Sequence, residues 1–130
     1  VGYLAKNKGV REIMKKFQKK IIKKNKRICV EGRDIASTIL KKNPRYDLAF
    51  YFTCNLNEAS IRRWKDLKKK VPLKEVKKSL SIRTRLDKKR KHSPLKKMRD
   101  AILIRTDKLN KKKVLLKMSK EIEKINYKIL

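Results

Sequence analysis

The chain has 130 residues, about the length of one domain, and 39% of them are hydrophobic, enough to bury a modest core. This composition excludes a chain that is disordered throughout. The 42 Lys and Arg residues against 12 Asp and Glu give a formal net charge of +30, so the surface attracts polyanions. Because the lysines are spread over the whole length, a solvated basic surface explains most of this excess.

The cysteines and the histidine limit the redox and metal chemistry. Cys29 and Cys54 lie in or beside apolar runs without a closely spaced partner, which favours reduced thiols in a cytoplasmic protein. Together with His92 they do not form a metal site. No apolar run is long enough to cross a membrane, and no signal peptide is visible. The first residue is Val1 and not Met, which indicates a record that begins inside a longer protein.

Apolar residues at helical spacing predict an amphipathic helix over residues 9–24: Val10, Ile13, Met14, Phe17 and Ile21. Residues 28–30 are apolar and are followed by Gly32, Arg33 and Asp34. We expect a buried strand there, with a binding loop at its carboxyl end, because the run is too short for a helix and Val and Ile favour strands. Gly32 lets the backbone turn or approach a ligand closely. Residues 35–40 are expected to form a short helix.

In the second half, residues 48–52 form an unbroken apolar run typical of a strand with helices on both faces. A helix should begin with Asn55 or Asn57 as its cap and end towards residue 70. Pro72 begins another helix over about residues 73–91, and residues 101–104 form a third strand. The last helix carries an apolar stripe that faces the core or docks on a partner: Leu115, Met118, Ile122, Ile125 and Ile129.

This alternation of helices and strands predicts an α/β fold with a parallel sheet and right-handed crossovers. Ligands of such folds gather beyond the carboxyl ends of the strands. By this rule, a few polar residues should surround one crevice: Gly32, Arg33, Asp34, Thr53 and Thr106.

One helix face changes from apolar to charged. Val76, Leu80, Arg83, Asp87 and Arg90 follow one another at steps of three or four residues and share one stripe. Two arginines around a carboxylate can hold a phosphate while the carboxylate accepts from sugar hydroxyls. The alternative is a ladder of salt bridges on a solvated surface, worth only a few tenths of a kcal/mol per pair.

An ordered set of motifs resembles the bacterial cytidylate kinases, nucleoside monophosphate kinases of the P-loop class. The motifs are Val10-Arg11 followed by Gln18, Gly32-Arg33-Asp34-Ile35, Arg62-Arg63, Arg83 with Asp87 and Arg90, Ser93-Pro94-Leu95, and Asp100-Ala101 leading to Thr106 and Leu109. The resemblance covers nearly all of the chain. It implies a P-loop kinase-like parallel sheet flanked by helices and incomplete at the N-terminal side, with residues 1–130 forming the C-terminal part of the kinase domain and a lid segment at about residues 56–72.

The resemblance assigns a CMP-binding site to Arg11, Arg33, Asp34, Arg83, Asp87 and Arg90. Arg11 and Asp34 would read the cytosine, because a carboxylate that accepts from the exocyclic amine distinguishes cytosine from uracil. Arg33 and Arg90 would hold the phosphate. Arg83 and Asp87 would hold the ribose. Alternatively, Arg11 is an exposed helix residue, and Arg33 and Asp34 are structural partners of neighbouring loops.

The resemblance assigns the catalytic role to Arg62 and Arg63, which would close over the ATP phosphates from the lid. Alternatively they are two more cations on a basic helix. The family's phosphate-binding turn ends in Gly-Lys-Ser/Thr. The chain's glycines are Gly2, Gly9 and Gly32, and none begins such a turn. We therefore expect a C-terminal part that is inactive by itself, with ATP and Mg²⁺ bound mostly by the missing N-terminal part.

Three departures from the family pattern leave base selectivity and fine positioning open: Gly2 for a serine, Ala36 and Ser37 for Gly-Thr, and Arg105 for an acidic residue. The expected activity is transfer of the γ-phosphoryl of ATP to CMP or dCMP. The expected partners are these nucleotides, with no specific nucleic acid and no membrane, and the full-length protein is expected to be a monomer. The rival hypothesis is a small basic, ribosome-associated RNA-binding protein, whose RNA binding would depend strongly on salt.

Overall fold

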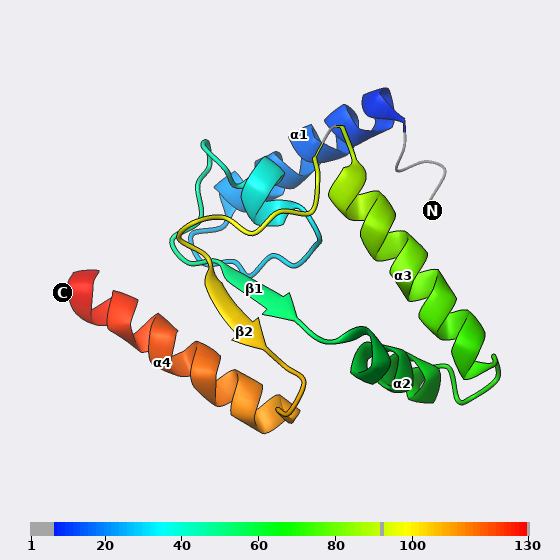
Figure 1. Ribbon diagram of the computed structural model, residues 1–130. Coiled ribbons are helices and arrows are strands. Elements are labelled where there is room, and N and C mark those ends of the chain that lie inside the picture. The colour runs from blue at the N-terminus through cyan, green and yellow to red at the C-terminus, as the bar shows by residue number, and fades with distance from the viewer. Residues whose placement is uncertain (1–6, 92, 130) are drawn as a thin grey trace. The chain divides into compact units, whose positions relative to one another are not determined.

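The computed structural model describes residues 7–91 and 93–129 and carries seven elements (Figure 1). They are α1 (Lys8–Lys24), the π-helical turn η2 (Ile35–Ile39), β1 (Phe50–Thr53), α2 (Leu56–Asp66), α3 (Leu73–Lys89), β2 (Ile102–Arg105) and α4 (Lys111–Ile129). They belong to two compact units. The first unit comprises Val1–Asp47 and Leu86–Met98, and the second unit comprises Leu48–Arg85 and Arg99–Leu130.

Helix α1 confirms the amphipathic helix predicted over residues 9–24. The side chain of Asn7 caps its first turn by accepting from the backbone N–H of Val10 at 3.1 Å. Of its apolar side chains only Ile22 is buried, whereas Ile13 is 69% and Phe17 is 58% exposed. The periodicity therefore predicted the helix correctly, but most of its apolar stripe lies on the surface.

A small hydrophobic core holds the first unit together. Ile22 of α1 packs with the end of η2, and the core residues are Ile22, Ile39 and Leu40 with the partly buried Val30, Ile35 and Tyr46. The short helix expected over residues 35–40 is present as η2, in which the N–H of Leu40 donates to the carbonyl of Ile35 at 2.8 Å. The core therefore fixes η2, and with it the loop that precedes it.

The buried strand predicted over residues 28–30 is wrong. Ile28 is 44% exposed, Cys29 is exposed, and the segment is irregular. In the part of the chain that the structure describes, the sheet consists of β1 and β2, and neither pairs with this segment. An apolar run becomes a strand only when another strand satisfies its backbone groups, and here it has no such neighbour. Cys29 and Cys54 are both free thiols.

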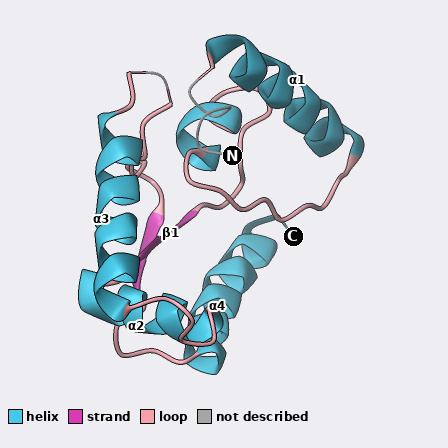
Figure 2. Cartoon of the chain, turned by 90° about the vertical axis from the view of Figure 1, so that its right-hand side faces the viewer, coloured by secondary structure: helices cyan, strands magenta, loops and turns pink. Residues whose placement is uncertain are grey.

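The second unit is built on the parallel pair β1 and β2, shown in magenta in Figure 2. The register runs from Phe50 opposite Ile102 to Thr53 opposite Arg105. The hydrogen bond from Thr106 N–H to the Thr53 carbonyl, at 2.8 Å, extends the pairing past the last residues of the strands. This confirms an α/β fold with a parallel sheet, in which the carboxyl ends of both strands meet at one edge.

Helix α2 begins as predicted, with Asn55 as its cap, but ends at Asp66 rather than near residue 70. Lys68 and Lys69 have φ angles of 52° and 59°, and positive φ angles do not occur within a right-handed helix. The N–H of Lys69 donates to the Trp64 carbonyl at 3.0 Å. The helix therefore closes with a left-handed turn that its lysine-rich sequence does not signal.

Helix α3 lies close to its predicted range, and α4 contains the stripe residues predicted for the last helix. The stripe of α4 was expected to face the core or to dock on a partner, but Leu115 is 63% exposed and Ile122 is also exposed. The core-facing alternative is therefore wrong for these two residues. The side chain of Ile129 lies outside the described residues. Among the described helices, none combines the length and apolar character needed to span a membrane.

Candidate functional site

An aspartate and an arginine meet at the start of η2. Arg11, in the first turns of α1, donates from Nη2 to Oδ2 of Asp34 at 2.6 Å, and both side chains are largely buried. The carbonyl of Asp34 accepts from the N–H of Thr38 at 2.9 Å, which fixes the backbone of Asp34 at the start of η2. The sequence brings the pair together because α1 and η2 share one core.

A second carboxylate lies between two arginines. Asp87, near the end of α3, is only 2% exposed and forms ion pairs with Nε of Arg33 through Oδ2 and with Nη2 of Arg90 through Oδ1. A buried carboxylate is costly unless it is paired, and here a cation faces each oxygen. The surface-ladder alternative is therefore wrong for Asp87, which is buried and paired outside its own helix.

The segment after α3 folds back onto this site. The N–H of Leu95 donates to the carbonyl of Asp87 at 2.8 Å, and Oγ of Ser37 lies 3.4 Å from the carbonyl of Pro94. The Ser93-Pro94-Leu95 motif thus connects the end of α3 to η2. These contacts hold Asp87 and Asp34 within the same unit.

Gly32 lies close to the side chain of Ile35 in the same loop. A Cβ atom at this position would lie 2.7 Å from Cγ1 and 2.9 Å from Cδ1 of Ile35. Ile35 packs against the core, so a side chain at position 32 would displace it. The close approach expected of Gly32 is therefore made to a protein side chain.

The site is suited to an anion. Its side chains carry three positive and two negative charges, from Arg11, Arg33 and Arg90 against Asp34 and Asp87. A guanidinium has five N–H donors in a rigid fork, so a single carboxylate does not use all the donors of two guanidinium groups. A phosphate could join Arg33 and Arg90 without breaking their contact with Asp87.

The structure brings together five of the six residues predicted for this site. The sixth, Arg83, belongs to the second unit, and its side chain is exposed. Its role beside Asp87 stays a prediction. No contact tests the chemical role of any of the six, so their assignment to a ligand belongs to the proposal below.

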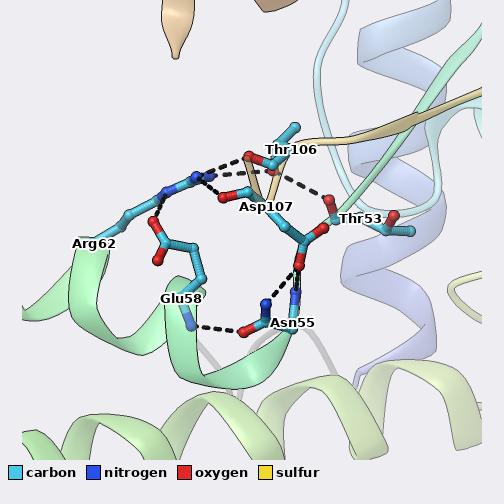
Figure 3. A network of polar contacts seen from close by, with 6 residues as sticks. All are labelled: Thr53, Asn55, Glu58, Arg62, Thr106 and Asp107. Carbon is cyan, nitrogen blue, oxygen red and sulfur yellow. Dashed lines mark hydrogen bonds and ion pairs between the residues drawn. The ribbon is translucent and has the colours of Figure 1, made fainter. Parts of the chain in front are cut away.

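A second polar cluster lies at the carboxyl edge of the sheet in the second unit (Figure 3). Arg62 donates from Nε to Glu58 Oε1 at 2.8 Å and from Nη2 to the Thr106 carbonyl at 2.8 Å. Oγ1 of Thr106 donates to the carbonyl of Thr53 at 3.1 Å, so the two threonines predicted to share a crevice are neighbours. That Gly32, Arg33 and Asp34 join them stays a prediction. Arg63 is exposed on α2.

Asp107 completes this cluster, and the sequence analysis did not single it out. Its Oδ1 accepts from both the backbone N–H and the side-chain amide of Asn55, each at 2.7 Å. Asn55 was recognised only as a helix cap. The sequence feature that could have identified Asp107 is its place two residues beyond a strand, at the edge of a parallel sheet where polar groups gather.

These contacts lower the pKa of Asp107 below its ordinary value of 3.8, chiefly because the N–H of Asn55 donates to the carboxylate. The side-chain amide of Asn55 and the charge of Arg62 act in the same direction, and partial burial opposes them. The ionised form is thus favoured in the fold, so its contribution to stability is present above pH 3.8 and is lost as the pH falls through the lowered pKa.

We expect an NMR titration of the Asp107 carboxyl carbon to give a pKa below 3.8. Asn55→Ala should move this pKa only part of the way back, because it removes the side-chain amide and keeps the backbone N–H at position 55. Asp66, exposed at the other end of α2, provides the control resonance, which Asn55→Ala should not shift. A titration of Asp107 at or above 3.8 would contradict the hydrogen bonding seen here.

Within the described ranges, no group of three or more His, Cys, Asp or Glu side chains is placed to hold a metal ion. His92 lies outside those ranges.

Comparison with known proteins decides the family of this chain. The family model described as "Cytidylate kinase" matches residues 1–124. The chain belongs to the cytidylate kinase family. It is 37% identical over 109 residues to the cytidylate kinase of Alkaliphilus oremlandii, covering 82% of this chain and 48% of that protein. With the cytidylate kinase of Caldanaerobacter subterraneus it shares 37% identity over 118 residues, 88% of this chain and 51% of the relative.

The cytidylate kinase of Thermosipho melanesiensis is 34% identical over 122 residues, 92% of this chain and 54% of the relative. The chain therefore spans about half the length of the curated relatives it matches. The family predicted from the ordered motifs is confirmed. The RNA-binding alternative receives no support from these matches.

Proposed function

We propose that this chain forms the acceptor site of an enzyme that transfers the γ-phosphoryl of ATP to CMP or dCMP. The proposal depends on the position of Asp87, which is buried between Arg33 and Arg90. The Arg11–Asp34 ion pair lies in the same unit. Membership of the cytidylate kinase family supports the reaction class. The acceptor site belongs to the first unit, whose core already orders α1 and η2.

Each side chain has a role that its chemistry supports. Asp34 accepts from the exocyclic amine of cytosine, and Arg11 holds that carboxylate in place through the 2.6 Å ion pair. Arg33 and Arg90 bind the phosphate through guanidinium forks. Asp87 keeps both forks oriented and accepts from the ribose hydroxyls. The ribose role of Arg83 stays a prediction.

The lid segment at about residues 56–72 supplies the charges that face ATP. Arg62 and Arg63 of α2 are proposed to offset negative charge that develops on the transferred phosphoryl group, while the lid excludes water. Catalysis on this view is mainly the positioning of two polyanions. Mg²⁺, which the family implies, would neutralise phosphate charge, but the described residues offer it no cluster of carboxylates, so no step is assigned to it here.

Nucleotide binding to the 130-residue chain tests the acceptor site directly. We expect calorimetric titration to show CMP binding at least about tenfold tighter than UMP, because a carboxylate that accepts from the cytosine amine meets a carbonyl oxygen in uracil. The intact gene product should phosphorylate CMP with ATP as donor. Equal binding of CMP and UMP, or no transfer to either nucleotide, would overturn the proposed function.

A further inference from the structure

Asp107 ties helix α2 to the end of β2 in addition to Thr106, which accepts from Arg62. The carboxylate of Asp107 accepts twice from Asn55 at 2.7 Å, and the carbonyl of Asp107 accepts from Nη2 of Arg62 at 3.2 Å (Figure 3). Asn55 directly precedes α2, and Arg62 lies in its second turn. Asp107 thus holds the helix at two points, and all of these residues belong to the second unit.

The side chain of Asn55 both accepts and donates a hydrogen bond. Its Oδ1 accepts from the N–H of Glu58 at 2.8 Å and caps α2, while its Nδ2 donates to Asp107. Ser or Asp at this position would still cap the helix but would have no amide to offer the carboxylate. The amide group therefore couples the start of α2 to the sheet edge, where β1 and β2 are already joined by Thr106 and Thr53.

We propose that Asp107 is a positioning residue for the lid segment, which it anchors to the carboxyl edge of the sheet. This inference rests on the proposed function, in which Arg62 and Arg63 of that segment meet the ATP phosphates. The side chain of Arg62 lies against Thr106 and the Asp107 carbonyl, so its direction is set from the sheet. Arg63 is the next residue of the same helix, and its side chain is exposed. The direction in which Arg63 points therefore depends on the orientation of α2.

Amide hydrogen exchange in the 130-residue chain tests the anchor without any nucleotide. Asp107→Ala should speed exchange at the amides of Asn55 and Glu58 about tenfold, because it removes charge-assisted hydrogen bonds. Asp66→Ala, which deletes an exposed carboxylate of the same helix, should leave these rates within about twofold of wild type. Asp107→Asn keeps one acceptor oxygen without the charge and should restore part of the protection. Wild-type rates in Asp107→Ala would overturn the proposal.

Kinetics of the intact gene product separate positioning of the lid from general damage. Asp107→Ala should lower kcat about tenfold and leave the KM for CMP within about twofold, because Asp107 contacts Asn55 and Arg62, neither of which belongs to the acceptor site. A rise in the KM for CMP at unchanged kcat would contradict a role in the lid. If the wild-type protein shows no transfer, the proposed function fails, whereas the exchange experiment still decides whether Asp107 anchors α2.

Discussion

Asp87→Ala is expected to lower the free energy of unfolding by about 3–5 kcal/mol, the loss typical when one partner of a buried ion pair is removed. The Asp87 side chain is nearly fully buried, and its two oxygens face Arg33 and Arg90. Without the carboxylate, two guanidinium groups that are 34% and 29% exposed remain near each other and lose the negative charge between them. Urea unfolding, combined with amide exchange at Ile39 and Leu40 in the core of the first unit, measures the loss.

Two further substitutions make this result specific. Asp66→Ala removes an exposed carboxylate, and its effect should stay within about 0.5 kcal/mol. Asp87→Asn keeps the size and one acceptor oxygen of the side chain, so its loss should lie between those of the other two variants. If Asp87→Ala unfolds within about 1 kcal/mol of wild type, the buried carboxylate does not hold the two arginines.

The sequence predicted the helices and the positions of β1 and β2 well, since both depend on local signals. Helical spacing located α1, Asn55 located the start of α2, and Pro72 located the start of α3. The unbroken apolar runs before Thr53 and Thr106 predicted two strands, and these pair in parallel. The coverage of both faces expected of residues 48–52 is incomplete, since Phe52 is 48% exposed. Such signals lie within a few residues of the structure that they specify.

The failures have a different physical origin. Residues 28–30 have the composition of a strand, but strand formation depends on a pairing partner that no local pattern encodes. The left-handed turn at Lys68 and Lys69 arises without the glycine that usually marks it.

The candidate site shows the same division. Spacing alone could place Asp87 and Arg90 on the same side of the chain at the end of α3, but Arg33, the other partner of Asp87, comes from a distant loop. The ordered motifs identified Arg11, Arg33 and Asp34 through resemblance and not through geometry. The sequence did not predict the hydrogen bonds between Asn55 and Asp107, because each residue has an ordinary local explanation. Asn55 is explained as a helix cap, and Asp107 as a polar residue after a strand.

Replacing Arg33 should separate the phosphate role of this site from its structural role. Arg33→Lys keeps a positive charge near Asp87 but loses the guanidinium fork, and Arg33→Ala loses both. We expect CMP binding to weaken about tenfold in the lysine variant and about hundredfold in the alanine variant, because charge-assisted hydrogen bonds to the phosphate are lost. Calorimetric titration with CMP measures both effects.

Cytidine, which has the base and ribose of CMP without its phosphate, is the internal control for this experiment. Its affinity should change by no more than about twofold in either variant, provided that circular dichroism shows each variant to be folded. Lys111→Ala, which removes an exposed cation at the start of α4, should leave the binding of both ligands unchanged. If cytidine and CMP lose affinity equally, Arg33 acts on the fold of the site and not on the phosphate, and the acceptor assignment of the Arg33–Asp87–Arg90 cluster is wrong.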